Sequence, residues 1–175
     1  MAKKALFKII VAGNGGVGKT TLLKRFVDGT FDMNTKMSIG VELHQKTVEI
    51  NENISCSLIL WDLGGQEQFR FMLDRFIDGA YGAILMFDLT RIQTLYDLDE
   101  WIKLVRYQDD NLPCILIGGK SDLMKNFLGN DKAIQYKKDN HLLDYFKVSS
   151  KTGMNVNETF ESLVKGILDY NLIEY

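Results

Sequence analysis

A glycine-rich segment near the N-terminus has the residue types and the spacing of a loop that cradles phosphate groups. It follows the pattern G-x-x-x-x-G-K-[ST] and consists of Gly13, Asn14, Gly15, Gly16, Val17, Gly18, Lys19 and Thr20. Glycines let the backbone adopt positive φ and come close to a ligand, so successive N–H groups can point at phosphate oxygens. We expect Lys19 to reach the outer phosphates and Thr20 to bind Mg²⁺. The alternative is a strand-to-helix turn that binds no ligand.

A second group of residues suits chemistry at a terminal phosphate. Asp62 stands at the end of an apolar run, where a carboxylate can hold Mg²⁺ through a water molecule. Gly65 offers a backbone N–H that can reach a γ-phosphate, and Gln66 offers an amide that can orient an attacking water. Lys19 and Gln66 are therefore the candidate catalytic residues. The alternative for this segment is a strand end followed by a simple turn.

Strands and helices that could position these residues alternate along the chain. Runs of β-forming residues predict strands at 6–12, 41–50, 54–61, 83–89, 113–118 and 145–148. Helical spacing of apolar residues predicts helices at 20–27, 69–77, 94–107, 132–140 and 156–170. This order predicts an α/β fold with a mostly parallel sheet covered on both faces, in which the hairpin 41–61 adds one antiparallel strand. The loops after Ala12, Trp61, Gly118 and Val148 should converge at the carboxyl edge of the sheet.

Composition limits the class of protein. The chain has 175 residues, of which 46% are hydrophobic and 25% charged, so we expect a single domain spanning 1–175. A net charge of −2 without any block of basic residues argues against nucleic-acid binding. His44 and His141 are far apart in the sequence and lack ligand spacing, which favours ordinary surface or strand histidines over a metal site.

The cysteines and the two termini bear on location. Cys56 and Cys114 lie in apolar, strand-like runs, so we expect buried thiols in a reducing compartment and a cytoplasmic protein. Residues 1–4 carry neither a glycine for myristoylation at position 2 nor a signal peptide, and residues 171–175 carry no cysteine for prenylation. We therefore expect no direct membrane anchor in this chain, with any recruitment to a membrane made through partners.

Residues 118–122, Gly-Gly-Lys-Ser-Asp, follow a predicted strand and complete a set of motifs that points to a family. The segments GNGGVGKT, WDLGGQEQF, GGKSD and SSK resemble, in order and spacing, the small GTPases of the Ras superfamily from about residue 6 to residue 170. MSIGVEL, WDLGGQEQFR and DGAYGAILMFDLT are most similar to Rab-like members, whereas the paired glycines of DLGGQ are similar to Arf and Gα proteins. The resemblance implies the P-loop NTPase fold, with three α/β/α layers around a six-stranded sheet.

The resemblance also assigns roles around a guanine nucleotide. It implies that Asp122 accepts two hydrogen bonds from guanine and that Lys120 lies along the base. It also implies that Ser150 offers its backbone N–H to the guanine carbonyl and that Lys151 supports the other face of the base. Phe31 stands where the family has an aromatic side chain against the nucleotide. The implied nucleotide-binding residues are Gly13, Asn14, Gly15, Gly16, Val17, Gly18, Lys19, Thr20, Thr21, Phe31, Ser38, Gly65, Lys120, Asp122, Ser150 and Lys151. The implied Mg²⁺ ligands are Thr20, Ser38 and Asp62, the last through water.

The activity implied is that of a switch that hydrolyses GTP to GDP and phosphate, with Mg²⁺ as cofactor. Loops at about 30–40 and 63–78 would engage an activating protein, an exchange factor and effectors. Leu43, Trp61 and Phe76 match side chains that Rab-like proteins present to effectors, although they could instead pack against each other. Because no residue is a convincing arginine finger, we expect slow hydrolysis without an activating partner.

Two positions depart from the family pattern. Gly119 replaces an Asn that bonds the base and braces the phosphate loop, and such a bond contributes about 0.5–1.5 kcal/mol. We therefore expect weaker but still guanine-selective binding with faster release. Ser38 replaces a Thr, which keeps the hydroxyl but loses the stiffening β-branch. These departures leave open a binding module with little hydrolysis. A P-loop phosphotransferase would need an arginine-bearing lid and an acceptor site, and we find neither in the sequence.

Overall fold

The computed structural model describes residues 3–34, 38–65, 73–124 and 128–173. These residues form a six-stranded sheet in the order β2-β3-β1-β4-β5-β6. The strands are β1 (Lys3–Ala12), β2 (Val41–Asn51), β3 (Ile54–Leu63), β4 (Gly82–Asp88), β5 (Cys114–Gly119) and β6 (Tyr145–Lys147). β2 runs antiparallel to β3 and the other neighbours pair in parallel, so the predicted mostly parallel sheet with one antiparallel strand is confirmed.

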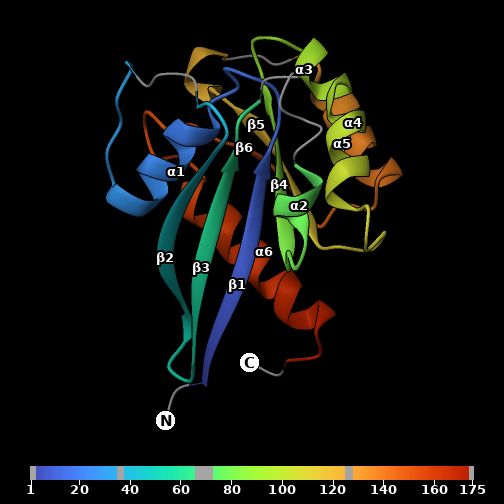
Figure 1. Cartoon of the computed structure of the whole chain (residues 1–175). Coiled ribbons are helices and arrows are strands. Elements are labelled where there is room, and N and C mark those ends of the chain that lie inside the picture. The colour runs from blue at the N-terminus through green and yellow to red at the C-terminus, as the bar shows by residue number, and fades with distance from the viewer. Residues whose placement is uncertain (1–2, 35–37, 66–72, 125–127, 174–175) are drawn as a thin grey trace.

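Helices cover both faces of this sheet (Figure 1). They are α1 (Lys19–Asp28), α2 (Asp74–Ile77), α3 (Gln93–Tyr96), α4 (Leu98–Val105), α5 (Asn130–Asp139) and α6 (Val156–Tyr170), with a short 3₁₀ helix at Ser121–Leu123. One apolar core lies between the sheet and α1 and α6, and the other between the sheet and α2 to α5. The helix predicted at 94–107 is in fact two segments that meet at Asp97.

Burial along the strands follows their place in the sheet. Every residue of the central strands β4 and β5 is buried, which explains their unbroken apolar sequences. The edge strand β2 is mostly exposed and has the mixed polar sequence of a strand with one solvated side. Cys56 and Cys114 are buried free thiols, as the sequence predicted. Hydrophobic burial thus places β1, β3, β4 and β5 at the centre of the molecule.

The strand order also creates the site. From the carboxyl end of β1 the chain passes to α1 on one face of the sheet, whereas from β4 it passes to α3 on the other face. Ligands of open α/β sheets bind in the crevice where the connections diverge in this way. β1 and β3 are in register from Lys3↔Ile54 to Val11↔Asp62, so the carboxyl ends of these two strands lie side by side.

Candidate functional site

The glycine-rich loop joins the carboxyl end of β1 to the first turn of α1. Gly13, Gly16 and Gly18 have φ values of 146°, 74° and 109°, a region that glycine adopts without strain. A Cβ at Gly13 would lie 2.2 Å from the carbonyl oxygen of Met86 on β4, so the loop can approach the sheet only without a side chain there. α1 begins at Lys19, within this segment, and the first N–H groups of an α-helix have no partner within the helix and carry its positive end. The predicted strand, loop and helix are confirmed.

Lys19 holds a positive charge inside this loop. Its Nζ donates to the carbonyl oxygens of Gly13 at 2.7 Å and Asn14 at 3.0 Å, and the residue is almost fully buried. Burial lowers the pKa of Lys19 to about 8, and the negative charge of Asp62 only partly opposes that shift. An anion bound in the loop would favour the charged form, so the geometry and the pKa both suit a phosphate ligand.

Three oxygen-bearing side chains meet beside the loop. Thr20 Oγ1 lies 2.7 Å from Ser38 Oγ and donates to Asp62 Oδ2 at 2.5 Å, and Ser38 Oγ donates to the same oxygen at 3.4 Å. Burial raises the pKa of the Asp62 carboxyl, while the Thr20 hydrogen bond and the charge of Lys19 oppose the increase. Two hydroxyls and a carboxylate form the all-oxygen donor set that Mg²⁺ prefers. The structure therefore brings together Thr20, Ser38 and Asp62, and these residues fit the predicted ion.

A cavity of about 400 Å³ extends from this point along the loop. Fourteen of its lining residues were predicted to bind nucleotide: Gly15, Gly16, Val17, Gly18, Lys19, Thr20, Thr21, Phe31, Ser38, Gly65, Lys120, Asp122, Ser150 and Lys151. Four lining residues were not predicted: Asp32, Met33, Met86 and Leu123. Met86 was missed because a methionine within an apolar strand carries no signal for a ligand. Asp32, Met33 and Leu123 are sequence neighbours of predicted residues, which was the available signal. Gly13 and Asn14 belong to the loop but are not among the residues that line the cavity.

The far end of the cavity carries the residues predicted to read a base. Lys120 has φ 62°, a left-handed conformation that turns the chain out of β5. Its Nζ donates to Gly16 O at 2.8 Å and to Asp88 Oδ2 at 2.7 Å, which ties the end of β5 to the phosphate loop. Asp122 is exposed at the cavity, and its Oδ1 accepts a hydrogen bond of 2.7 Å from Ser149 Oγ. That bond orients the carboxylate.

Gly119, where the sequence departs from the family pattern, lies against Met86. A Cβ added to Gly119 would be 2.4 Å from the Met86 Cε and 3.2 Å from the Val17 carbonyl oxygen. A side chain at position 119 would therefore require the terminal methyl of Met86 to move aside and the Val17 carbonyl to shift slightly. The side-chain amide that the family pattern has at position 119 is absent, and the apolar Met86 side chain packs beside Gly119 instead.

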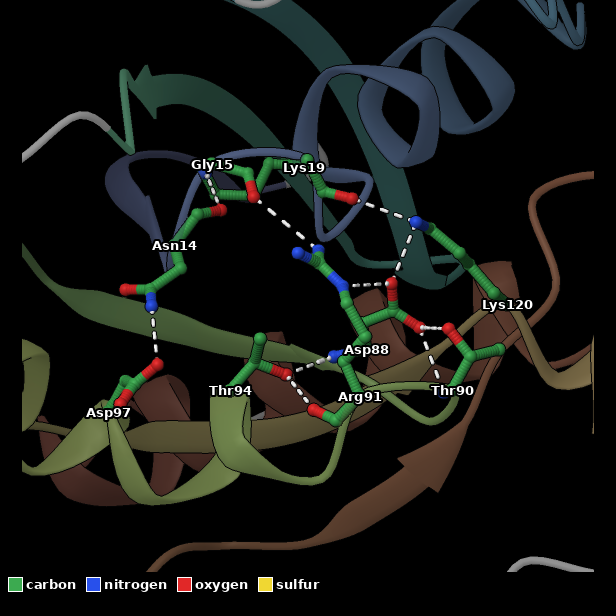
Figure 2. Close-up of polar contacts among 10 residues, drawn as sticks. Asn14, Gly15, Lys19, Asp88, Thr90, Arg91, Thr94, Asp97 and Lys120 are labelled. Atoms are coloured by element: carbon green, nitrogen blue, oxygen red, sulfur yellow. Dashed lines mark hydrogen bonds and ion pairs between the residues drawn. The ribbon is translucent and has the colours of Figure 1, made fainter.

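Asp88 is the centre of a polar network that holds the loop from the β4 side (Figure 2). It accepts hydrogen bonds from Lys120, from the Thr90 hydroxyl at 2.7 Å and from Arg91 Nε at 3.0 Å. Burial would raise the pKa of Asp88, but these hydrogen bonds outweigh it and hold the pKa below its usual value. Arg91 Nη2 also donates to Gly15 O at 3.4 Å. Two cations on one buried carboxylate thus support two carbonyls of the loop.

Two hydrogen bonds, which we call the α4 clasp, join the Asn14 side chain of the loop to Trp101 and Asp97. Trp101 Nε1 donates to Asn14 Oδ1 at 2.9 Å, and Asn14 Nδ2 donates to Asp97 Oδ2 at 2.6 Å. Asp97 is the residue at which the predicted helix divides into α3 and α4. The Asn14 side chain is therefore held at both ends, and Figure 2 shows its bond to Asp97. The sequence indicated none of these partners, since they lie more than 80 residues away.

The three predicted effector-contact residues lie on β2, β3 and α2. Leu43 pairs with Trp61 across β2 and β3 and is 60% exposed. The rings of Trp61 and Phe76 lie 5.9 Å apart, and Lys8 Nζ lies 4.0 Å from the centroid of the Trp61 ring. The two aromatic rings therefore pack together while Leu43 is exposed, and contact with effectors stays a prediction.

Gln66, the predicted water-positioning residue, lies outside the described residues. The adjacent Gly65 is described, and its backbone lies directly on the phosphate loop, since a Cβ there would be 2.3 Å from the Gly15 nitrogen. Only glycine allows this approach. Within the described ranges, no helix combines the length and apolar character that crossing a bilayer requires.

Comparisons with known proteins agree with this geometry. The model of a family described as the Ras family matches residues 8–169. The chain is 33% identical over 172 residues to Ras-related protein Rab-32B of Dictyostelium discoideum, with 95% of this chain and 66% of that protein covered. It is 34% identical over 171 residues to Ras-related protein Rab-9A of Rattus norvegicus, covering 95% and 85%. It is 36% identical over 165 residues to Ras-related protein Rab-2B of Dictyostelium discoideum, covering 93% and 81%.

Proposed function

The chain belongs to the Ras family as a Rab-like small GTPase, and from this premise we propose that it is a molecular switch that hydrolyses GTP to GDP and phosphate. The observation that carries the proposal is the arrangement of one cavity. Its inner end has Lys19 with the Thr20, Ser38 and Asp62 oxygens beside it, and its outer end has the Asp122 carboxylate. A phosphate chain and a base would each meet the groups that recognise them.

Selectivity for guanine rests on Asp122. Its carboxylate accepts two hydrogen bonds, and guanine presents two adjacent N–H donors that adenine lacks. Ser149 holds the carboxylate in place, and Lys120 forms the adjoining wall of the cavity. Ser150 and Lys151 line the cavity next to them. We infer that an adenine nucleotide would offer this carboxylate no matching pair of N–H donors.

Hydrolysis needs charge neutralisation at the outer phosphates and an oriented water. Mg²⁺ would supply the first when held by Thr20 and Ser38, with Asp62 acting through water. Lys19 binds the same phosphates and keeps its proton as their charge increases. Gln66 orients the attacking water in this proposal. Because none of these groups is a mobile arginine, intrinsic turnover is expected to be slow, and a partner that supplies an arginine would accelerate it about 10³–10⁵-fold.

The switch itself is proposed to act through the loops at about 30–40 and 63–78. Ser38 contacts Thr20, and Gly65 lies against Gly15, so both loops touch the place where the terminal phosphate would bind. Loss of that phosphate would release them. Leu43, with Trp61 and Phe76 beneath it, is the proposed contact for effectors, and an exchange factor and an activating protein are the other expected partners.

One experiment tests the nucleotide and the reaction together. We expect the purified chain to carry GDP or GTP, to bind GDP far more tightly than ADP, and to hydrolyse bound GTP in a single turnover that requires Mg²⁺. Asp122→Asn should weaken GDP and favour xanthosine diphosphate, because the new NH₂ group donates to the carbonyl that xanthine has in place of the guanine amine. Equal binding of ADP and GDP would contradict guanine selectivity. Tight GTP binding without phosphate release would instead indicate a binding module.

A further inference from the structure

Two buried polar atoms beside the predicted Mg²⁺ ligands have no hydrogen-bond partner among the described residues. They are His44 Nε2 on β2 and Asp62 Oδ1 on β3. Asp62 is fully buried, and the His44 side chain is 16% exposed. Polar atoms buried in this way are normally paired with protein, water or an ion, so each needs an explanation.

The pairing of β2 with β3 places a third ligand next to these two atoms. Glu42 is opposite Asp62 in the antiparallel register, and His44 is two residues along from Glu42, so all three share one face of the sheet. One ligand atom from each residue lies within 4.8 Å of the other two, and His44 Nε2 is 3.9 Å from Glu42 Oε2. The 3.9 Å separation is too long for a hydrogen bond, but a small ion between the side chains would contact both.

We propose that Glu42, His44 and Asp62 form a second divalent-cation site, whose imidazole and two carboxylates select a transition metal such as Zn²⁺ over Mg²⁺. Zn²⁺ accepts nitrogen and carboxylate oxygen ligands at about 2.0–2.2 Å, whereas Mg²⁺ prefers oxygen alone. Glu42 is half exposed, so an ion can enter from its side and keep a water as fourth ligand. The sequence concealed this site because the third ligand comes from a different strand.

The site goes beyond the proposed function, since Glu42 and His44 are not among the residues that line the nucleotide cavity. It shares Asp62 with the Mg²⁺ ligands but uses the other oxygen. Thr20 and Ser38 contact Oδ2, while Oδ1 remains without a partner among the described residues. Two cations on one carboxylate repel each other, so occupancy here should weaken Mg²⁺ binding, and by linkage Mg²⁺ should weaken Zn²⁺ binding.

The test is a Zn²⁺ titration of the full chain, with a chromophoric chelator as competitor and Mg²⁺ and GDP in excess. The wild type should bind one Zn²⁺, and His44→Leu should bind it about 100-fold more weakly because an imidazole ligand is lost. His141→Asn is the control, because the chain has only two histidines and Asn tolerates the left-handed backbone of His141, with φ 50°; it should bind as the wild type does. His44→Gln repeats the measurement in case the leucine variant does not fold. Identical curves for the wild type and the His44 variants, or loss of binding in His141→Asn, would overturn the site.

A second measurement tests whether the proposed site includes the Asp62 carboxylate, which is also a predicted Mg²⁺ ligand. Saturating Zn²⁺ should raise the Mg²⁺ concentration needed for half-maximal GDP retention several-fold in the wild type and leave it unchanged in His44→Leu. An unchanged requirement in the wild type would contradict a site that includes Asp62. A chain that bound Zn²⁺ through His44 but bound no GDP would support this site and contradict the proposed function. A chain that bound GDP but did not bind Zn²⁺ through His44 would contradict this site and not the proposed function.

Discussion

The two ends of the cavity differ in how far the protein satisfies its own charges. At the base end, Asp88 is bonded to Lys120, Arg91 and Thr90, and Asp122 is held by Ser149. At the metal end, Asp62 has an oxygen without a partner among the described residues. The base end is thus built by the protein alone, whereas the metal end is left for ligands to complete.

The pKa shifts express the same difference. Hydrogen bonds hold the pKa of Asp88 below its usual value, so the base end stabilises a charged carboxylate. Burial lowers the pKa of Lys19 to about 8 and raises that of Asp62, so the metal end disfavours both charges. The charges that burial makes costly are the ones that a phosphate and a cation would stabilise. This arrangement suits a protein whose conformation depends on its ligand.

The largest expected effect comes from removing the positive charge of Lys19 at the metal end of the cavity. Lys19→Met should weaken GDP at least about 100-fold, because it removes charge-assisted bonds to the phosphates from a buried site. Release of a fluorescent GDP analogue measures the change. Lys138→Met, on the exposed side of α5, keeps the same change of side chain away from the cavity and should have no effect. A wild-type affinity in Lys19→Met would show that the loop does not bind phosphate through this residue.

Breaking the network of the base end should act on stability as well as binding. Asp88→Asn leaves Lys120 and Arg91 without their shared partner and should reduce the free energy of unfolding by about 2–3 kcal/mol. Because the folded pKa of Asp88 is depressed, its contribution is present above the unfolded value of about 3.9 and is lost as the pH falls further. Urea unfolding at pH 7 and pH 3 measures this. A difference between wild type and variant that grew on acidification would contradict the assignment.

The packing of Gly119 on Met86 can be tested by restoring the family residue. Gly119→Asn alone should destabilise the fold by about 1–2 kcal/mol, the lower part of the usual cost of overpacking, and speed GDP release, because the flexible end of Met86 must move aside and the Val17 carbonyl must shift. Met86→Val with Gly119→Asn should recover most of the loss, since the shorter side chain makes room for the amide. A double-mutant cycle on thermal unfolding gives the coupling, expected at about 0.5–3 kcal/mol. Strict additivity would mean that the two positions are independent.

The smallest effect is expected at the clasp on α4. Trp101→Phe retains an aromatic ring in the core but removes the N–H that donates to Asn14 Oδ1. We expect a loss of about 1 kcal/mol in the free energy of unfolding and a modest increase in GDP release. Trp61→Phe, on β3, is a control for loss of an indole and should leave GDP release unchanged. Equal release rates in wild type and Trp101→Phe would show that the clasp does not brace the loop.

Most of the fold could be predicted because its signals are local. Apolar strands between amphipathic helices, and glycines that precede Lys19 and Thr20, report on neighbours a few residues away. Of the helix predicted at 69–77, residues 69–72 lie outside the described residues, and α2 spans Asp74–Ile77. The helix predicted at 94–107 divides at Asp97, where the carboxylate bonds to Asn14 of a distant loop. Periodicity could not reveal this, because the apolar spacing continues through the break.

The sequence by itself determined the family, the six-stranded sheet and the residues proposed to bind the phosphates, since these depend on residue type at fixed local spacing. Only the tertiary structure decided how the departures are accommodated. Met86 occupies the space beside Gly119, Asp88 collects Lys120 and Arg91, and two strands bring His44 to Asp62. Each of these pairings joins residues that are distant in the chain, and the pairing of strands and the packing of side chains create such contacts only when the whole sheet has formed.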